Sequence, residues 1–329
     1  MKKILVILCG IILFAISCEK SHKVGHFPNN ATNFADVNSE FDDYNSDLKV
    51  IDLCYVLSFS TNRKSNGNNF DIIAKEVNIC WYQENGVFEM YARDINKSDN
   101  RVKNLDSVLN IINTPYNELG PYSIPWYSNL FLYANDSEGN YDIKFIDKDN
   151  FSVSDIKFLK SDANELYPSF YGKDFFFYDQ WGTNINKVEK FIYCSDKEGN
   201  FNIYEVAVPA GKDIVEFLKS KETYESVKLN INSSANDKCP SVNGKLLVFS
   251  SDRPGGYGGF DLYYSIYQNG SWSNPVNFGD KINTPYDEYR PITLHMDGFD
   301  NNLLLFSSNR PGGKGGFDLY YVGIKQMIK

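Results

Sequence analysis

The chain has 329 residues, a formal net charge of −9 at pH 7, and contents of 42% hydrophobic and 16% aromatic residues. This length suits one large or two ordinary domains, and the hydrophobic content is enough to bury a sizeable core. The negative charge argues against a nucleic-acid-binding protein and against a polybasic surface that docks on anionic lipid. Tyr and Phe dominate the aromatic residues and turn clusters are frequent, so we expect a mostly β protein.

The N-terminal residues have the organisation of an export signal. Two lysines precede an apolar run over residues 4–16, which has the length of a signal-peptide core and is too short to span a bilayer comfortably. The small residues before Cys18 resemble a bacterial lipobox, in which the cysteine is acylated and becomes the first residue. We therefore expect a signal peptide over residues 1–17, lipidation at Cys18 and a tether over residues 18–29. An ordinary secretory signal, or a short anchor with an incidental cysteine, is the alternative.

Four further cysteines follow in the exported part: Cys54, Cys80, Cys194 and Cys239. None lies in C-x-x-C spacing and none has histidines placed for zinc, so they do not predict a metal site. Four small, mostly buried thiols are the simpler interpretation. One disulfide is the alternative in an exported protein, and its pairing cannot be read from the sequence.

A repeated β-hairpin determines the predicted fold. The two clearest copies read LLVFSSDRPGGYGGFDLYY at residues 246–264 and LLLFSSNRPGGKGGFDLYY at residues 303–321. Each copy reads as an apolar strand, a polar turn and an aromatic strand. Weaker copies stand at residues 57–74, 131–146 and 191–206. A second motif precedes every hairpin, at residues 37–46, 112–121, 159–168, 231–240 and 282–291.

A further strand-like segment, such as residues 272–281, precedes the second motif and gives each unit four strands, as in the blades of a β-propeller. Residues 30–38 resemble residues 274–283, so we expect this N-terminal segment to supply the outer strand that the last unit lacks and to close the ring. The patterns predict an all-β propeller of five four-stranded blades over residues 30–329. Extra residues around 78–105 and 170–190 leave a sixth blade as the alternative.

The two C-terminal hairpins resemble the WD-like repeats of TolB-type β-propellers, which are common in envelope proteins of Bacteroidetes. The resemblance covers roughly residues 37–322 through the repeats, and the first three copies depart from it because they lack Pro-Gly-Gly. TolB-type propellers generally have six blades, whereas we count five here. The resemblance implies a periplasmic or outer-membrane-associated binding scaffold without catalysis of its own.

Six polar residues recur at matching positions of the last two hairpins: Asp252, Arg253 and Asp261, then Asn309, Arg310 and Asp318. A carboxylate beside a glycine-rich turn most often accepts backbone N–H groups, so we interpret these residues as structural. Calcium binding by the repeated aspartates is the alternative, because oxygen-rich turns also suit that ion. We otherwise expect no metal and no cofactor.

The sequence contains no recognisable catalytic motif of the serine-hydrolase, zinc-protease or phosphate-binding-loop type. Paired carboxylates contributed by different blades stay open, because acidic residues are numerous. A rigid propeller with a wide face of loops suits binding. We therefore expect a non-catalytic outer-membrane lipoprotein that acts as a scaffold for a protein partner in the cell envelope. The alternative is a propeller enzyme or a lectin-like module that acts on or binds glycans or peptides.

Aromatic residues near predicted loops are the candidates for a partner surface, because such side chains often anchor interfaces. They are Trp126, Trp181, Tyr257 and Tyr289.

Overall fold

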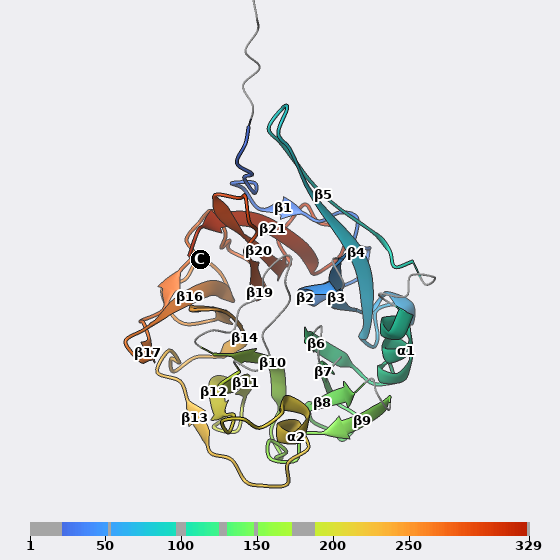
Figure 1. The fold of residues 1–329 in the computed structure, drawn as a ribbon, viewed down its shortest axis with the longest axis vertical. Helices are drawn as coiled ribbons and strands as arrows, with labels where there is room; N and C mark the ends of the chain where they lie inside the picture. The colour runs from blue at the N-terminus through green and yellow to red at the C-terminus, as the bar shows by residue number, and fades with distance from the viewer. Residues whose placement is uncertain are drawn as a thin grey trace, which may run out of the picture.

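The computed structural model describes residues 22–51, 54–96, 103–124, 130–147, 151–172 and 188–327. These residues form five antiparallel sheets that surround a central axis as the blades of a propeller (Figure 1). The prediction of an all-β propeller with five four-stranded blades is confirmed.

The strands follow one another from the axis outward in blades 1 to 4. Blade 1 contains β2 (Asp43–Ile51), β3 (Cys54–Thr61), β4 (Asp71–Tyr82) and β5 (Val87–Asp94). Blade 2 contains β6 (Glu118–Ile124), β7 (Leu130–Asn135), β8 (Asp142–Asp147) and β9 (Ser152–Asp155). Blade 3 contains β10 (Glu165–Tyr171), β11 (Lys190–Ser195), β12 (Asn202–Ala207) and β13 (Ser226–Lys228). Blade 4 contains β14 (Asp237–Asn243), β15 (Leu246–Ser251) and β16 (Asp261–Gln268), with β17 (Ser271–Trp272) and β18 (Val276–Asn277) both paired to β16.

Blade 5 joins the two ends of the propeller. It contains β19 (Glu288–Leu294), β20 (Asn301–Ser308) and β21 (Asp318–Lys325), and its outer strand is β1 (Thr32–Asn33) from the N-terminal side. Thr32 lies opposite Tyr321 in this antiparallel pair. The expected closure of the ring by an N-terminal strand is therefore confirmed.

A repeated asparagine ties the segment before four of the five inner strands to the third strand of the preceding blade, and Lys160 stands at this position before β10. In blade 5, the Asn38 side chain accepts from the Leu319 N–H at 2.8 Å and donates to the Leu319 carbonyl at 2.9 Å. The same pair of bonds joins Asn283 to Leu262 in blade 4. Asn113 and Asn232 make it with Ile72 and Ile203.

The hydrophobic core lies between neighbouring blades and is divided among several clusters. Each blade contacts a neighbour on both faces, so strands such as β15 and β20 are buried along their whole length and read as almost continuous apolar runs. The inner strands contact one another around the axis in the order β2, β6, β10, β14, β19 and back to β2. This ring surrounds a central channel.

Two short α-helices lie outside the sheets in the described part of the chain: α1 (Lys103–Ile112) and α2 (Ile214–Leu218). Helix α1 packs Leu105, Val108 and Ile112 against blades 1 and 2. The extra residues around 78–105 form the end of β4, the strand β5 and the start of α1 in the described part of the chain, and not a sixth blade. None of the described helices is long and apolar enough to span a membrane.

Candidate functional site

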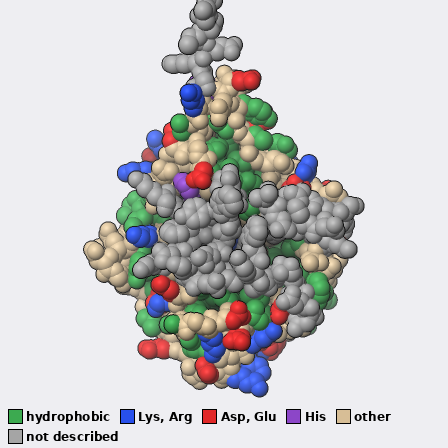
Figure 2. All heavy atoms as spheres, viewed as in Figure 1, with side chains coloured by type: hydrophobic (Ala, Val, Ile, Leu, Met, Phe, Trp, Pro, Cys, Tyr) green, Lys and Arg blue, Asp and Glu red, His purple; other side chains and the backbone are tan. Residues whose placement is uncertain are grey.

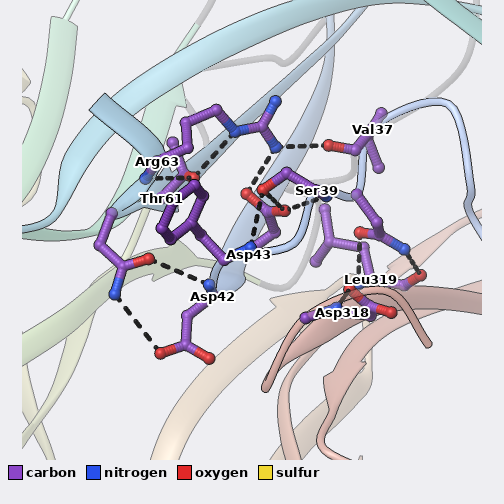
Figure 3. Close-up of polar contacts among 12 residues, drawn as sticks. Val37, Ser39, Asp42, Asp43, Thr61, Arg63, Asp318 and Leu319 are labelled. Atoms are coloured by element: carbon purple, nitrogen blue, oxygen red, sulfur yellow. Dashed lines mark hydrogen bonds and ion pairs between the residues drawn. The ribbon is translucent and has the colours of Figure 1, made fainter. Parts of the chain in front are cut away.

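A buried carboxylate begins every inner strand, and three of the five are paired with an arginine. The five residues are Asp43, Glu118, Glu165, Asp237 and Glu288, each at most 1% exposed. Figure 3 shows the arrangement in blade 1, where Arg63 donates to the Asp43 carboxylate, to the Val37 carbonyl and to the Thr61 hydroxyl. Arg253 and Arg310 make the corresponding contacts in blades 4 and 5.

Blades 2 and 3 lack this arginine, because Ser137 and Lys197 occupy its position. Burial raises the pKa of Glu118 to about 7 and the pKa of Glu165 to about 7. Hydrogen bonds to Glu118 from Thr114 and Asn135 oppose this rise only in part. The two glutamates are enclosed in the protein, so they belong to the framework and are not accessible to a ligand.

The other recurring polar residues also contact neighbouring segments of the repeat. Asp252 accepts from the Asn236 N–H at 2.7 Å, and Asn309 accepts from the Asp287 N–H at 2.8 Å. Asp261 accepts from the backbone N–H groups of Tyr257 and Gly258 in the glycine-rich turn.

Asp318 makes the same kind of contacts in the last turn, where it accepts from the N–H groups of Lys314 and Gly315. The Asn33 and Asn277 side chains donate to Asp318 and Asp261 respectively. The carboxylates of Asp252, Asp261 and Asp318 therefore already accept protein donors. No cluster of three or more His, Cys, Asp or Glu side chains suited to a metal ion exists among the described residues.

A pocket of about 530 Å³ lies at the end of the channel where the inner strands begin. We call it the aromatic cup and define it by its lining, which comes from all five blades: Tyr44, Leu119, Tyr141, Asn164, Leu166, Tyr167, Phe201, Lys238, Phe260, Asp287, Tyr289 and Phe317. This size is typical of pockets that hold small-molecule ligands.

The repeat itself places the aromatic rings of the cup. Tyr141, Phe201, Phe260 and Phe317 each stand directly before the third strand of a blade. Their backbone N–H groups donate to Asn or Asp side chains that precede the next inner strand. The Phe260 N–H, for example, donates to Asp287 at 2.8 Å. Each ring is therefore held where two neighbouring blades meet.

Below the cup, one residue in each inner strand has a positive φ angle at or beside an irregularity in strand pairing: Asn45, Gly120, Tyr167, Cys239 and Arg290. Such irregularities re-aim side chains relative to the regular strand. Gly120 is required here, because a Cβ atom at this position would lie 2.6 Å from the Tyr167 ring.

The Arg290 side chain is fully buried and extends from blade 5 to three other blades. Its guanidinium donates to the Pro240 carbonyl of blade 4 at 3.1 Å and to the Pro121 carbonyl of blade 2 at 3.3 Å. It also lies over the Tyr167 ring of blade 3, 5.4 Å from the ring centre. A side chain that contacts three blades in this way crosses the axis, so Arg290 and Tyr167 block the channel beneath the cup.

The charged groups in and beneath the cup differ in the ion pairs and hydrogen bonds that they make. The Lys238 ammonium lies 3.9 Å from the centre of the Phe201 ring and 5.6 Å from that of Phe260. No carboxylate lies within ion-pair distance of Lys238 or Arg290 in the described part of the chain. Asp287, in contrast, accepts hydrogen bonds from the Phe260 N–H and the Asn309 side chain.

Two of the four residues predicted for a partner surface, Tyr257 and Tyr289, are described by the structure, and of these two Tyr289 lines the cup. Tyr257 is 49% exposed in the glycine-rich turn of blade 4 and does not line the cup. Trp126, Trp181 and the predicted lipidation site Cys18 lie outside the described residues. On the face shown in Figure 2, Lys and Arg side chains are interspersed with Asp and Glu among the described residues.

The described cysteines carry free thiols. They are Cys80, Cys194 and Cys239. Cys194 and Cys239 are completely buried, and burial raises the pKa of the Cys239 thiol to about 11. These two residues agree with the interpretation of small buried thiols, whereas the Cys54 side chain lies outside the described part.

Sequence reasoning did not identify the aromatic cup. A signal was present, because an aromatic residue precedes an Asp or Asn at the same place in all five hairpins: Phe70, Tyr141, Phe201, Phe260 and Phe317. We interpreted only the Asp and Asn positions, as turn residues.

Comparison with known proteins shows the fold and no family. No family model and no curated protein matches the chain. Among solved structures, a protein described as a glycoside hydrolase matches with a TM-score of 0.51 and 8% identity over 94% of this chain and 93% of its own. The α-L-arabinofuranosidase PaAbf62A from Podospora anserina matches with a TM-score of 0.48 and 9% identity, over 92% of this chain and 98% of its own. TolB from Acinetobacter baumannii matches with a TM-score of 0.36 and 12% identity, over 89% of this chain and 65% of its own.

The expectation of a non-catalytic protein-binding scaffold, and of no enzyme, is contradicted. A solved structure that matches with a TM-score of 0.51 along nearly the whole of both chains is described as a glycoside hydrolase. The expectation was drawn from the TolB-like repeat, but that repeat consists largely of turn and framework residues. Such residues build a propeller whatever its function is.

Proposed function

We propose that this protein acts on carbohydrate and binds a saccharide in the aromatic cup. The observation that carries the proposal is a pocket, closed below by Arg290 and Tyr167, in which aromatic rings from several blades surround a few polar groups. Sugar rings have apolar C–H faces that pack on aromatic faces, and hydroxyl edges that need a few well-placed polar partners. The cup offers both kinds of surface.

The fold supports the same class of ligand. The structure described as a glycoside hydrolase matches along nearly the whole of both chains, at 8% identity. Fold alone does not determine function, so the chemistry of the site has to be considered separately.

Hydrolysis of a glycoside ordinarily uses two carboxyl groups on either side of the scissile bond. Asp287 is the only carboxylate in the described lining of the cup, and it already accepts two hydrogen bonds. Saccharide binding is therefore supported by the residues of the cup, whereas hydrolysis is supported by the likeness of the fold. The experiment has to measure the two separately.

The test combines a binding assay with a product assay. The mature chain is applied to a panel of bacterial and plant glycans, binding is measured by calorimetry, and released sugars are measured by chromatography. Tyr289→Ala and Phe260→Ala should each weaken binding at least tenfold, because they remove ring surface from the cup. Tyr257→Ala is the matched control, since this exposed ring lies outside the cup. If no glycan binds, or if the control weakens binding equally, the proposal is wrong.

We also propose that the protein is an envelope lipoprotein anchored through Cys18. The lipobox-like sequence and the resemblance of the last two hairpins to TolB-type repeats support this location. Labelling of growing cells with radioactive palmitate should mark the protein, and Cys18→Ser should remove the label. Retention of the label in the variant would exclude lipidation at this residue.

A further inference from the structure

We propose that the saccharide bound in the aromatic cup carries a carboxylate, as a uronic acid does, and that Lys238 binds this carboxylate. The inference rests on the proposed function and adds the class of sugar. It is drawn from an excess of positive charge at the cup, to which one residue of the lining and one residue beneath the lining contribute.

Lys238 supplies the cation in the wall. Its side chain is half-buried at the start of β14, and its ammonium lies against the rings of Phe201 and Phe260. These rings hold the ammonium in place by attraction to their faces, but they do not neutralise its charge. Because no carboxylate of the described chain pairs with Lys238, the positive charge is directed to a ligand in the cup.

Arg290 supplies a second positive charge directly beneath the floor. The residue is fully buried, and two of its donors reach backbone carbonyls, while its Nε atom has no hydrogen-bond partner in the described part of the chain. A buried cation with no carboxylate at ion-pair distance is costly, and the cost falls when a negative charge approaches. The Tyr167 ring, which lines the cup, lies between this guanidinium and the ligand space.

Asp287 adds one negative charge to the lining, so Lys238, Arg290 and Asp287 together leave an excess of one positive charge at the cup. The two oxygens of Asp287 each accept a donor from the protein, which leaves the carboxylate tied to the wall. The chain as a whole carries a formal charge of −9, so this local excess of positive charge makes the cup an exception. A concave site with an excess of one sign of charge and low-dielectric walls concentrates ligands of the opposite sign.

A carboxylate on a sugar ring combines the two features that the cup offers. The ring packs against Tyr289 and Phe260, and the planar carboxylate lies against the Lys238 ammonium in a charge-assisted hydrogen bond. A neutral sugar would leave the ammonium without an anion. The cup therefore distinguishes an acidic sugar from its neutral analogue.

The test compares uronic acid oligosaccharides with their methyl esters, which keep the sugar and remove the charge. Galacturonate, glucuronate and mannuronate trimers are titrated by calorimetry against the mature chain, with a sulfated trisaccharide as a second anion. For at least one uronate we expect binding at least tenfold tighter than that of its ester, with the difference reduced at high salt. In Lys238→Met the preference should disappear while binding of the ester is kept, and Lys238→Arg should retain it.

Lys245→Met is the control, because it removes the same charge from an exposed position in the turn that follows β14. Equal binding of acid and ester, a preference that survives in Lys238→Met, or a stronger preference for the sulfated sugar would overturn the inference and leave the proposed function intact. Failure of every sugar, charged or neutral, to bind would instead refute the proposed function.

Discussion

Arg290 and Tyr167 stack on each other at the axis of the propeller, with the guanidinium 5.4 Å from the ring centre. They come from blades 5 and 3, and the arginine also donates to carbonyls of blades 2 and 4. The pair thus joins four of the five blades and closes the channel below the aromatic cup. The cup is a pocket with a floor because of this contact.

Replacing Arg290 should therefore destabilise the whole ring. Arg290→Met removes the donors to Pro121 and Pro240 and leaves two buried carbonyls without partners, so we expect the free energy of unfolding to fall by about 3 kcal/mol. Urea denaturation measures this change. Lys228→Met is the control: Lys228 pairs with Glu198 on the surface, with both side chains exposed, and should matter by less than about 1 kcal/mol. Equal effects of the two variants would contradict the role of Arg290.

Stability should decrease as pH rises from about 4.5 to about 7. Burial raises the pKa of Glu118 and of Glu165 to about 7, so in this range the folded protein holds protons that the unfolded chain has released. The stabilising effect of protonation is complete below pH 4.5 and is lost as pH passes 7. Glu165→Gln should remove part of this dependence and raise the free energy of unfolding at pH 8 by about 2 kcal/mol. Glu225→Gln, at an exposed position, should change neither quantity.

Supplying the arginine that blade 3 lacks should stabilise the protein. Lys197→Arg recreates the arrangement of blade 5, because the Ser195 hydroxyl already donates to Glu165 as the Ser308 hydroxyl does to Glu288. We expect a gain of about 1 kcal/mol at pH 8, where Glu165 is ionised, and almost none at pH 4.5. Thermal melting at the two pH values measures it.

The reverse change in blade 5 is the matched control for this prediction. Arg310→Lys should lower the melting temperature at pH 8, because lysine cannot reach the Glu288 carboxylate, the Ser308 hydroxyl and the Ile282 carbonyl together. A loss of stability in Lys197→Arg at pH 8 would show that the blades are not equivalent at this position.

The contacts that close the ring near β1 should stabilise the protein as much as the equivalent contacts between two other blades. Asn38→Ala removes both bonds to Leu319 and should lower the free energy of unfolding by about 2 kcal/mol. Asn283→Ala removes the same pair of bonds in blade 4 and should cost a similar amount. A negligible effect of Asn38→Ala beside a large effect of Asn283→Ala would mean that the ring is open at β1 in solution.

The sequence predicted the propeller because the same sequence motifs recur in every blade. Five hairpins, five preceding motifs and the likeness of residues 30–38 to residues 274–283 were enough to predict five blades and their closure. The carboxylates of Asp261 and Asp318 were correctly expected to accept backbone N–H groups of the turns.

The charged residues of the site were harder to predict because they depart from the repeat. Lys238 is the second residue of its inner strand, where other blades have Tyr44 or Leu119. Arg290 is the third residue of its inner strand, where blade 2 has Gly120. These two residues come together only when the ring of blades closes, and no local sequence pattern marks either of them. The function predicted from the sequence was wrong for the same reason, since it was drawn from the repeated framework.

The most direct test of the account is a crystal structure of the mature chain with the tightest-binding saccharide from the glycan panel. We predict density for a sugar ring in the aromatic cup, in contact with Phe260 and Tyr289 and above the Tyr167 ring. A saccharide bound at another face of the propeller, with the cup empty, would contradict the central claim.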